Sequence, residues 1–310
     1  MFSLRPGQAR AALLGLLVGD AVGVPYEFKR RDEVPDREFI EMTPPSGFRP
    51  TRPGAPRGTW SDDGAMTLAL LDSLQRDASL CEPDVASRLL AWFRKGKYAA
   101  DDIVFDCGVT VRAGLLAFER GTAAHLCGGA RESDNGNGAL VRSLACLLVP
   151  FESDAVLVDR AMRQGRCTHR HLRSQVVCAL YVLTAARVAL RAEGLPEAIK
   201  GAAGYLDAVL DWGARAELGL VMSKQLDEHR GSGYVVDSFW SAMGCVGATQ
   251  SFKACIQASV GLGNDTDSTA CVAGGVAGLL YGEECIPEDW LSGLRGRDRA
   301  MGLLSMGQWV

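Results

Sequence analysis

The sequence predicts an all-α fold, a compact single-domain helical bundle. Apolar residues recur at helical spacing along most of the chain, as in Ala86, Leu89, Leu90 and Phe93, which follow the i, i+3, i+4, i+7 pattern of an amphipathic helix. Alternating runs of β-branched residues between turns, the signal for strands, are almost absent. The chain has 310 residues, 47% of them hydrophobic and 23% charged, so it can bury a sizeable core.

The same spacing predicts the helices in chain order. An apolar run after Arg10 indicates the first helix, and Met66, Leu70 and Leu74 mark the second. The full set of predicted helices covers residues 8–19, about 66–74, about 86–93, 108–119, 138–148, 154–163, 172–191, 197–211, 235–248, 251–260 and 268–281.

One long irregular loop interrupts this pattern at about residues 29–58. It contains six prolines, which exclude a regular helix. A loop of this length inside a compact domain is unusual and is often functional. Because no second linker of this kind occurs, we expect one domain over residues 1–310.

Charge and hydropathy limit the partners. The net charge is −4 and no long basic block occurs, which argues against nucleic-acid binding. The longest uncharged runs, Ser238–Phe252 and Ser268–Gly282, have 15 residues each, short of the roughly 20 that a membrane span needs. The apolar run Ala11–Gly19 after Arg5 and Arg10 imitates a signal peptide, but Asp20 ends it.

The ten cysteines are scattered, form no CxxC motif and lie mostly among apolar residues. This pattern is typical of small buried side chains rather than of a disulfide framework. We therefore expect ten free thiols and a cytoplasmic location.

Two acidic clusters, each directly before a predicted helix, are the strongest candidates for chemistry. They are Ser61-Asp62-Asp63-Gly64 and, about 200 residues later, Asn264-Asp265-Thr266-Asp267-Ser268. Either cluster alone could be a helix N-cap, because Ser and Asp accept hydrogen bonds from the free N–H groups of the first turn. Each nevertheless holds more carboxylates than a cap needs.

If the two helix starts face each other, four carboxylates and two hydroxyls converge. Such like charges repel one another unless cations neutralise them. All six groups are hard oxygen ligands without His or Cys, which suits Mg²⁺ or Mn²⁺ and argues against Zn²⁺. Carboxylates that can bridge suggest two ions about 4 Å apart.

At these residues the chain resembles the ADP-ribosylglycohydrolase family, of the dinitrogenase-reductase-activating glycohydrolase type. Seven motifs occur in the family's order between Leu14 and about Gly282, so the resemblance covers nearly the whole chain. They are Gly19-Asp20-Ala21-Val22-Gly23 with Glu27, Ser61-Asp62-Asp63, Asp106-Cys107-Gly108-Val109-Thr110, Gly136-Asn137-Gly138 with Arg142, Thr168-His169, Gly233-Tyr234-Val235-Val236-Asp237, and Gly263-Asn264-Asp265-Thr266-Asp267-Ser268. The chain departs from the pattern at Gly64, where many members have Thr, and at Val141, where Met is usual.

The resemblance implies an all-α bundle around two Mg²⁺ or Mn²⁺ ions that bind the ribose diol of ADP-ribose. The implied protein ligands are Ser61, Asp62, Asp63, Asp265, Asp267 and Ser268, with Asp267 bridging. Asp106 is the candidate for proton transfer, although it could instead cap a helix. Glu27 would lie at the mouth, where the family uses it for gating or catalysis, or it could be a solvated loop carboxylate.

The remaining motif residues are candidates for substrate binding: Gly108, Asn137, Gly138, His169 and Tyr234. Free N–H groups at a helix start near Asn137 and Gly138 could hold a diphosphate, or the segment could be a plain turn. His169 stands among Arg166, Arg170, His171 and Arg173, a basic cluster that could offer charge to a phosphate. Tyr234 could stack on the ligand or pack in the core.

The resemblance implies a metal-dependent hydrolase that removes ADP-ribose from modified protein side chains. The Gly233–Asp237 motif favours arginine as the modified residue. Serine-linked, O-acetyl- or poly-ADP-ribose remains an alternative, and so does a non-catalytic protein of the same fold that occludes a toxin or transferase. The implied partner is an ADP-ribosylated protein, and a cognate ADP-ribosyltransferase or toxin is a second candidate.

Overall fold

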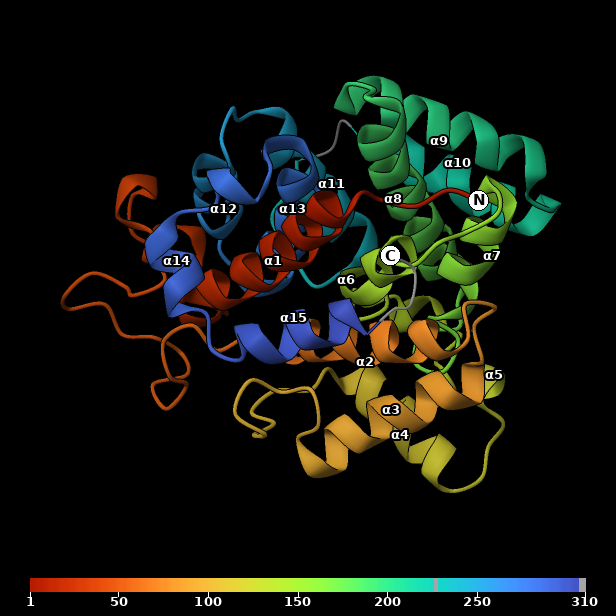
Figure 1. The fold of residues 1–310 in the computed structure, drawn as a ribbon, viewed down its shortest axis with the longest axis horizontal. Coiled ribbons are helices and arrows are strands. Elements are labelled where there is room, and N and C mark those ends of the chain that lie inside the picture. Colours follow the sequence, from red (N-terminus) through yellow and green to blue (C-terminus); the bar gives the residue numbers. More distant parts are fainter. Residues whose placement is uncertain (226–227, 307–310) are drawn as a thin grey trace.

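The computed structural model describes residues 1–225 and 228–306, and within them it confirms the all-α prediction (Figure 1). No strand occurs in these residues apart from isolated bridges. The α-helices are α1 Pro6–Gly23, α2 Asp62–Arg76, α3 Glu82–Lys95, α4 Val109–Glu119, α5 Ala124–Cys127, α6 Leu140–Ser143, α7 Asp154–Arg163, α8 Leu172–Arg191, α9 Leu195–Val209, α10 Trp212–Ser223, α11 Val235–Gly247, α12 Phe252–Val260, α13 Thr266–Tyr281, α14 Glu288–Gly293 and α15 Arg297–Ser305.

Helices α1 and α13 form the centre of the bundle and lie against each other in antiparallel directions (Figure 1). Glycines make this close approach possible. A Cβ on Gly15 would stand 2.4 Å from the Gly274 carbonyl oxygen, and one on Gly19 would stand 2.1 Å from the Ala270 carbonyl oxygen. Because no larger residue fits there, the sequence forces the end of α1 to meet the start of α13.

One predicted helix is divided in two. Residues 138–148 form α6, which is only four residues long, followed by the 3-10 helix Leu144–Leu147. The Ser143 hydroxyl donates to the Leu140 carbonyl oxygen at 2.7 Å, a local bond that competes with the α-helical ladder and tightens the turn. The prediction of a continuous helix here was wrong.

Four helices were not predicted, namely α5, α10, α14 and α15. Their buried faces are narrow: α15 buries only Ala300, and α10 buries only Ala214, Leu218 and Val221. Such sparse apolar spacing leaves little periodic signal in the sequence.

The proline-rich segment 29–58 contains only two single-turn 3-10 helices, Arg31–Glu33 and Arg37–Phe39. It is anchored in its middle by Ile40 and Met42, which are buried. At its end the Gly58 carbonyl oxygen accepts a hydrogen bond from the Arg295 N–H at 3.0 Å. The stretch between Met42 and Gly58 is therefore tethered at both ends.

Two described helical segments, Pro6–Tyr26 and Leu172–Arg191, are long and apolar enough to cross a membrane by length and composition. Counting uncharged runs missed both, because isolated charges interrupt them. In the fold, 83% and 78% of their apolar windows are buried, as expected of core helices.

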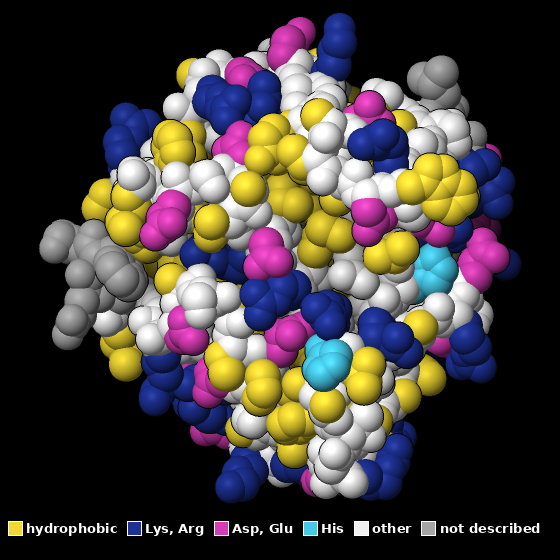
Figure 2. All heavy atoms as spheres, turned by 90° about the vertical axis from the view of Figure 1, so that its right-hand side faces the viewer, with side chains coloured by type: hydrophobic (Ala, Val, Ile, Leu, Met, Phe, Trp, Pro, Cys, Tyr) yellow, Lys and Arg dark blue, Asp and Glu magenta, His cyan; other side chains and the backbone are white. Residues whose placement is uncertain are grey.

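The face of the molecule shown in Figure 2 mixes basic and acidic side chains with scattered apolar ones. All ten cysteines are free thiols.

Candidate functional site

A cleft of about 220 Å³ opens where the helix starts and motif loops converge. Both acidic clusters reach it, although they lie about 200 residues apart in the sequence. Six carboxylates line the cleft: Glu27, Asp62, Asp63, Asp106, Asp265 and Asp267. The residues predicted for metal binding therefore face one space, with the exception that Ser61 lies behind the lining.

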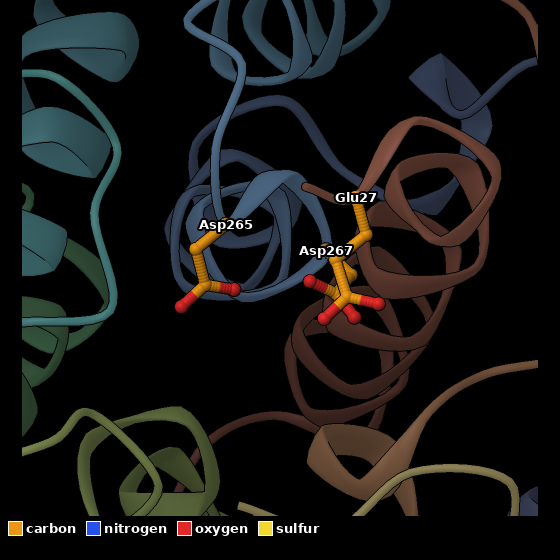
Figure 3. A group of neighbouring side chains, drawn as sticks. All are labelled: Glu27, Asp265 and Asp267. Atoms are coloured by element: carbon orange, nitrogen blue, oxygen red, sulfur yellow. The ribbon is translucent and has the colours of Figure 1, made fainter. Parts of the chain in front are cut away.

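Glu27, Asp265 and Asp267 form the tightest acidic group among the described residues (Figure 3). One ligand atom from each lies within 4.8 Å of the others. Glu27 follows the end of α1, whereas the two aspartates stand at the start of α13, so the antiparallel helix pair creates the group. Glu27 is only 4% exposed, which excludes the solvated loop carboxylate that the sequence left open.

The start of α2 supplies the other acidic pair and depends on Asp20, which the sequence placed in a motif but to which it assigned no role. Ser61 caps the helix, its hydroxyl accepting from the Asp63 N–H at 3.2 Å. The buried Asp20 carboxylate accepts from the N–H groups of Ser61 at 2.9 Å and Gly64 at 2.8 Å. The sequence did contain a signal for this role, because Asp20 is a charged residue within an otherwise apolar stretch of α1.

Burial strongly perturbs these carboxylates. Loss of hydration raises the pKa of Glu27 to about 8 and the pKa of Asp62 to about 7, and neighbouring carboxylates add to both shifts. For Asp63 and Asp267 burial raises the pKa well above the ordinary value, again with help from adjacent carboxylates. Buried carboxylates that repel one another are stabilised by protons or by other bound cations.

The residues present fit a divalent metal centre. Asp63 Oδ2 is buried and has no hydrogen-bond partner, which is costly unless something binds it. Helices α2 and α13 pack against each other, and the Ser268 hydroxyl partly offsets the rise that burial causes in the pKa of Asp63. Oxygen donors alone make up the set, as Mg²⁺ and Mn²⁺ prefer.

Asp106 lies in the loop before α4 and lines the cleft. The N-cap of α4 is Gly108, so Asp106 does not serve as the helix cap. Its carboxylate accepts from the Cys107 N–H at 2.7 Å and pairs with Arg52. The Gly108 N–H donates to Asp62 Oδ2 at 3.3 Å, which ties this loop to the acidic cluster.

Asn137 and Gly138 also line the cleft. Asn137 Nδ2 donates to Asp265 Oδ2 at 2.8 Å and to Ser238 Oγ at 3.0 Å, so it orients a candidate metal ligand. Gly138 permits close packing, because a Cβ there would stand 2.9 Å from Val111 Cγ2. The helix start whose free N–H groups were expected to hold a diphosphate belongs to α6, which has only four residues.

His169 itself adds no positive charge to the basic cluster that the sequence suggested around it. It is buried, and loss of hydration lowers its pKa to about 3, so the ring is neutral. Its Nδ1 lies 3.0 Å from Thr168 Oγ1, and Nε2 faces Gly136. Two of the arginines around it are paired with carboxylates: Arg166 with Glu82, and Arg173 with Glu132 and Glu217. The third, Arg170, donates to the Gly128 carbonyl oxygen.

Tyr234 lies at the rim rather than in the core, with 38% of its surface exposed. Its hydroxyl accepts from Arg173 Nη1 at 3.1 Å. The adjacent Gly233 lines the cleft, and the Gly233 carbonyl oxygen accepts from the Asn137 N–H at 3.1 Å. Stacking of Tyr234 on a ligand remains a prediction.

Arg52, from the proline-rich segment, is the site residue that sequence reasoning missed altogether. Its Nε donates to Glu27 Oε2 at 2.8 Å, and its Nη2 donates to Asp106 Oδ2. No periodicity or motif marks an arginine in an irregular loop, so only the folded chain reveals this contact.

Comparison with known proteins finds relatives along nearly the whole chain. The ADP-ribosylglycohydrolase family profile matches residues 4–308. The chain is 30% identical over 302 residues to an ADP-ribosylarginine hydrolase, Tri1, of Serratia proteamaculans, a match covering 96% of this chain and 77% of that protein. It is also 30% identical over 297 residues to the ADP-ribosyl-[dinitrogen reductase] glycohydrolase of Rhodospirillum rubrum, covering 93% and 90% of the two chains.

A solved structure shares the fold. A chain of an ADP-ribosylglycohydrolase-related protein complex superposes with a TM-score of 0.74 at 26% identity, and the match covers 97% of this chain and 96% of that one.

Proposed function

The chain belongs to the ADP-ribosylglycohydrolase family, and from this premise we propose that it removes ADP-ribose from arginine side chains of proteins in a reaction that depends on two Mg²⁺ or Mn²⁺ ions. The observation that carries the proposal is the cleft in which six carboxylates converge, one of them with a buried oxygen that has no partner. A purely structural protein has no need for such a costly arrangement.

The ligands of this centre would be the two aspartates at the start of α2, Asp265 and Asp267 at the start of α13, and the hydroxyls of Ser61 and Ser268. Two ions bound there would polarise the hydroxyls of the ribose and stabilise developing negative charge. Asp20 and Asn137 would hold the ligands in place, because each bonds a helix start or a carboxylate directly.

Hydrolysis places the oxygen of water on the anomeric carbon of ribose, breaks the carbon–nitrogen bond and returns a proton to the guanidine nitrogen. Asp106 is the proposed group for proton transfer, since it lines the cleft but belongs to neither helix start. The neutral His169 and the backbone around Gly138 would contact the diphosphate without a formal charge.

Two observations support arginine as the modified residue. The Gly233–Asp237 motif has the form found in arginine-directed members, and a relative that is 30% identical is named for ADP-ribosylarginine. Because all ten cysteines are free thiols, which fits a protein in a reducing compartment, we propose a cytoplasmic location. A cognate transferase or toxin is a further proposed partner.

The test is to incubate the protein with one substrate ADP-ribosylated on arginine and another on serine, with added Mg²⁺ or Mn²⁺ and after chelation. We expect release of ADP-ribose from arginine only, lost on chelation and restored by either ion. Asp267→Asn serves as the inactive control. Release from serine alone would contradict the proposed linkage. Metal binding without release from any substrate would instead favour an occluding protein.

A further inference from the structure

The proline-rich segment brings one side chain, Arg52, to two carboxylates that line the cleft. The Arg52 guanidinium donates to Glu27 Oε2 at 2.8 Å, to Asp106 Oδ2 and to the Phe105 carbonyl oxygen at 3.2 Å. All three guanidinium nitrogens are therefore used. The side chain is only 20% exposed, and that of Glu27 is 5% exposed, so water screens this contact poorly.

Two aromatic rings complete the surroundings of this guanidinium. Its central carbon lies 5.5 Å from the centroid of Phe28 and 5.6 Å from that of Phe105. Phe28 is held at a φ of 62°, with its N–H donating to the Asn264 carbonyl oxygen at 2.6 Å. A bulky residue rarely adopts this left-handed conformation, and here it keeps the ring beside the cation.

Two carboxylates, a carbonyl and two aromatic rings are the groups that recognise a planar cation with several N–H donors. We call Glu27, Phe28, Phe105 and Asp106 the guanidinium box. The box shares Glu27 with the tight acidic group that contains Asp265 and Asp267. It therefore directly adjoins the proposed position of the ribose.

In an ADP-ribosylated arginine, a guanidinium nitrogen is bonded to the anomeric carbon of that ribose. We propose that the guanidinium box is the subsite for the substrate's arginine and that Arg52 occupies it as an internal competitor until substrate displaces it. This inference rests on the proposed function and deepens it. Exchange of one guanidinium for another keeps the charge balance of the two carboxylates, whereas a serine-linked substrate brings no cation that could replace Arg52.

The segment that carries Arg52 has room to move. A cavity of about 460 Å³ lies on one side of residues 51–56, lined by Ile103 and Phe105 as well, and a second of about 100 Å³ lies against residues 50–59 on the side of Ala21 and Val24. Little packing would be lost if Arg52 swung out, because both sides of the segment already border empty space.

Binding of a small guanidinium tests the box without any turnover. The probe is ethylguanidinium, with ethylammonium as the matched cation that lacks the planar fork, and the readout is calorimetry on the full chain. We expect Arg52→Ala to bind ethylguanidinium on the order of tenfold more tightly than the unmutated protein, because the competitor is gone. Arg57→Ala, which removes a neighbouring arginine that donates to the Asp289 carbonyl oxygen and touches neither carboxylate of the box, should behave like the unmutated protein.

Adding Glu27→Gln and Asp106→Asn to Arg52→Ala should abolish the gain. If Arg52→Ala proves unstable, Arg52→Gln keeps the side-chain length and tests the same point. Equal affinity of the Arg52 variants and the unmutated protein for ethylguanidinium would overturn the proposal.

Kinetics then link the box to substrate. With an arginine-linked substrate, Arg52→Ala should lower KM on the order of tenfold. A raised KM would overturn the competitor role. If the unmutated protein releases no ADP-ribose from arginine while Arg52→Ala binds ethylguanidinium, the proposed function fails and the box stands as a guanidinium site. If release occurs but the variant gains no affinity, the further inference alone fails.

Discussion

Gly23, the last residue of α1, lies directly against Asp267 in the first turn of α13: a Cβ on Gly23 would stand 2.4 Å from the Asp267 Cα. The backbone of one helix end thus limits where a proposed bridging ligand stands. The contact also explains why Glu27, four residues further along, falls within the tightest acidic group.

Gly23→Ala should therefore damage both the fold and the site. The added methyl must push the start of α13 away, and overpacking of this kind costs about 1–3 kcal/mol of unfolding free energy. We expect weaker Mg²⁺ binding as well, measured by calorimetry. Gly15→Ala, which clashes with the Gly274 carbonyl oxygen far from the cleft, should cost similar stability and leave metal affinity nearly unchanged. Gly204→Ala on α9 meets nothing within 4 Å and should stabilise slightly.

Asp63→Asn should separate two effects of the acidic cluster, the loss of folding stability that its charge causes and its binding of Mg²⁺. Burial and adjacent carboxylates raise the Asp63 pKa, so its charged form opposes folding. At mildly alkaline pH without metal, the amide should stabilise the protein by on the order of 1–3 kcal/mol. The rise in melting temperature on adding Mg²⁺ should disappear in the same variant. Asp101→Asn, which breaks a surface pair with Arg295, should keep the Mg²⁺ response; a normal response in Asp63→Asn would remove this residue from the ligand set.

Asp106→Asn should slow release of ADP-ribose on the order of 10²–10⁴-fold, the usual contribution of a positioned acid or base. Metal binding and ADP-ribose binding should persist, because Asp106 belongs to neither helix start. Asp267→Asn should instead weaken both kinds of binding together. Single-turnover rates and calorimetry on the two variants make the comparison, and near-normal turnover in Asp106→Asn would exclude its role in proton transfer.

His169 should give the protein a distinct acid sensitivity. Its pKa falls from 6.5 to about 3 in the folded state because of burial, so between these values the unfolded chain binds one more proton than the native one. The contribution of His169 to the free energy of unfolding is therefore fully present above about pH 6.5. It falls by about 1.4 kcal/mol per pH unit as the pH is lowered towards the folded-state pKa. Denaturant unfolding of His169→Gln should show a shallower decline than the unmutated protein. The exposed His125→Gln should follow the unmutated curve, and parallel curves for His169→Gln would contradict the neutral buried ring.

Much of the fold was predictable because helical periodicity is local. The spacing of apolar residues identified α2, α3, α7 and α8, and the prolines identified the irregular segment. The spacing could not reveal α15, which buries one alanine. Nor could it reveal the break after α6, where a serine hydroxyl donates a hydrogen bond to a backbone carbonyl oxygen. These features depend on contacts that do not repeat along the chain.

For the site, the sequence by itself determined the donor chemistry: two oxygen-rich clusters at helix starts, without His or Cys, and the ordered motifs around them. Only the tertiary structure decided how these groups combine. The antiparallel packing of α1 on α13 brings Glu27 to Asp267, burial leaves His169 neutral, and an irregular segment inserts Arg52 between two carboxylates. Hydration and the distance between charges set these properties, and both are fixed by residues far away in sequence, which no local pattern encodes.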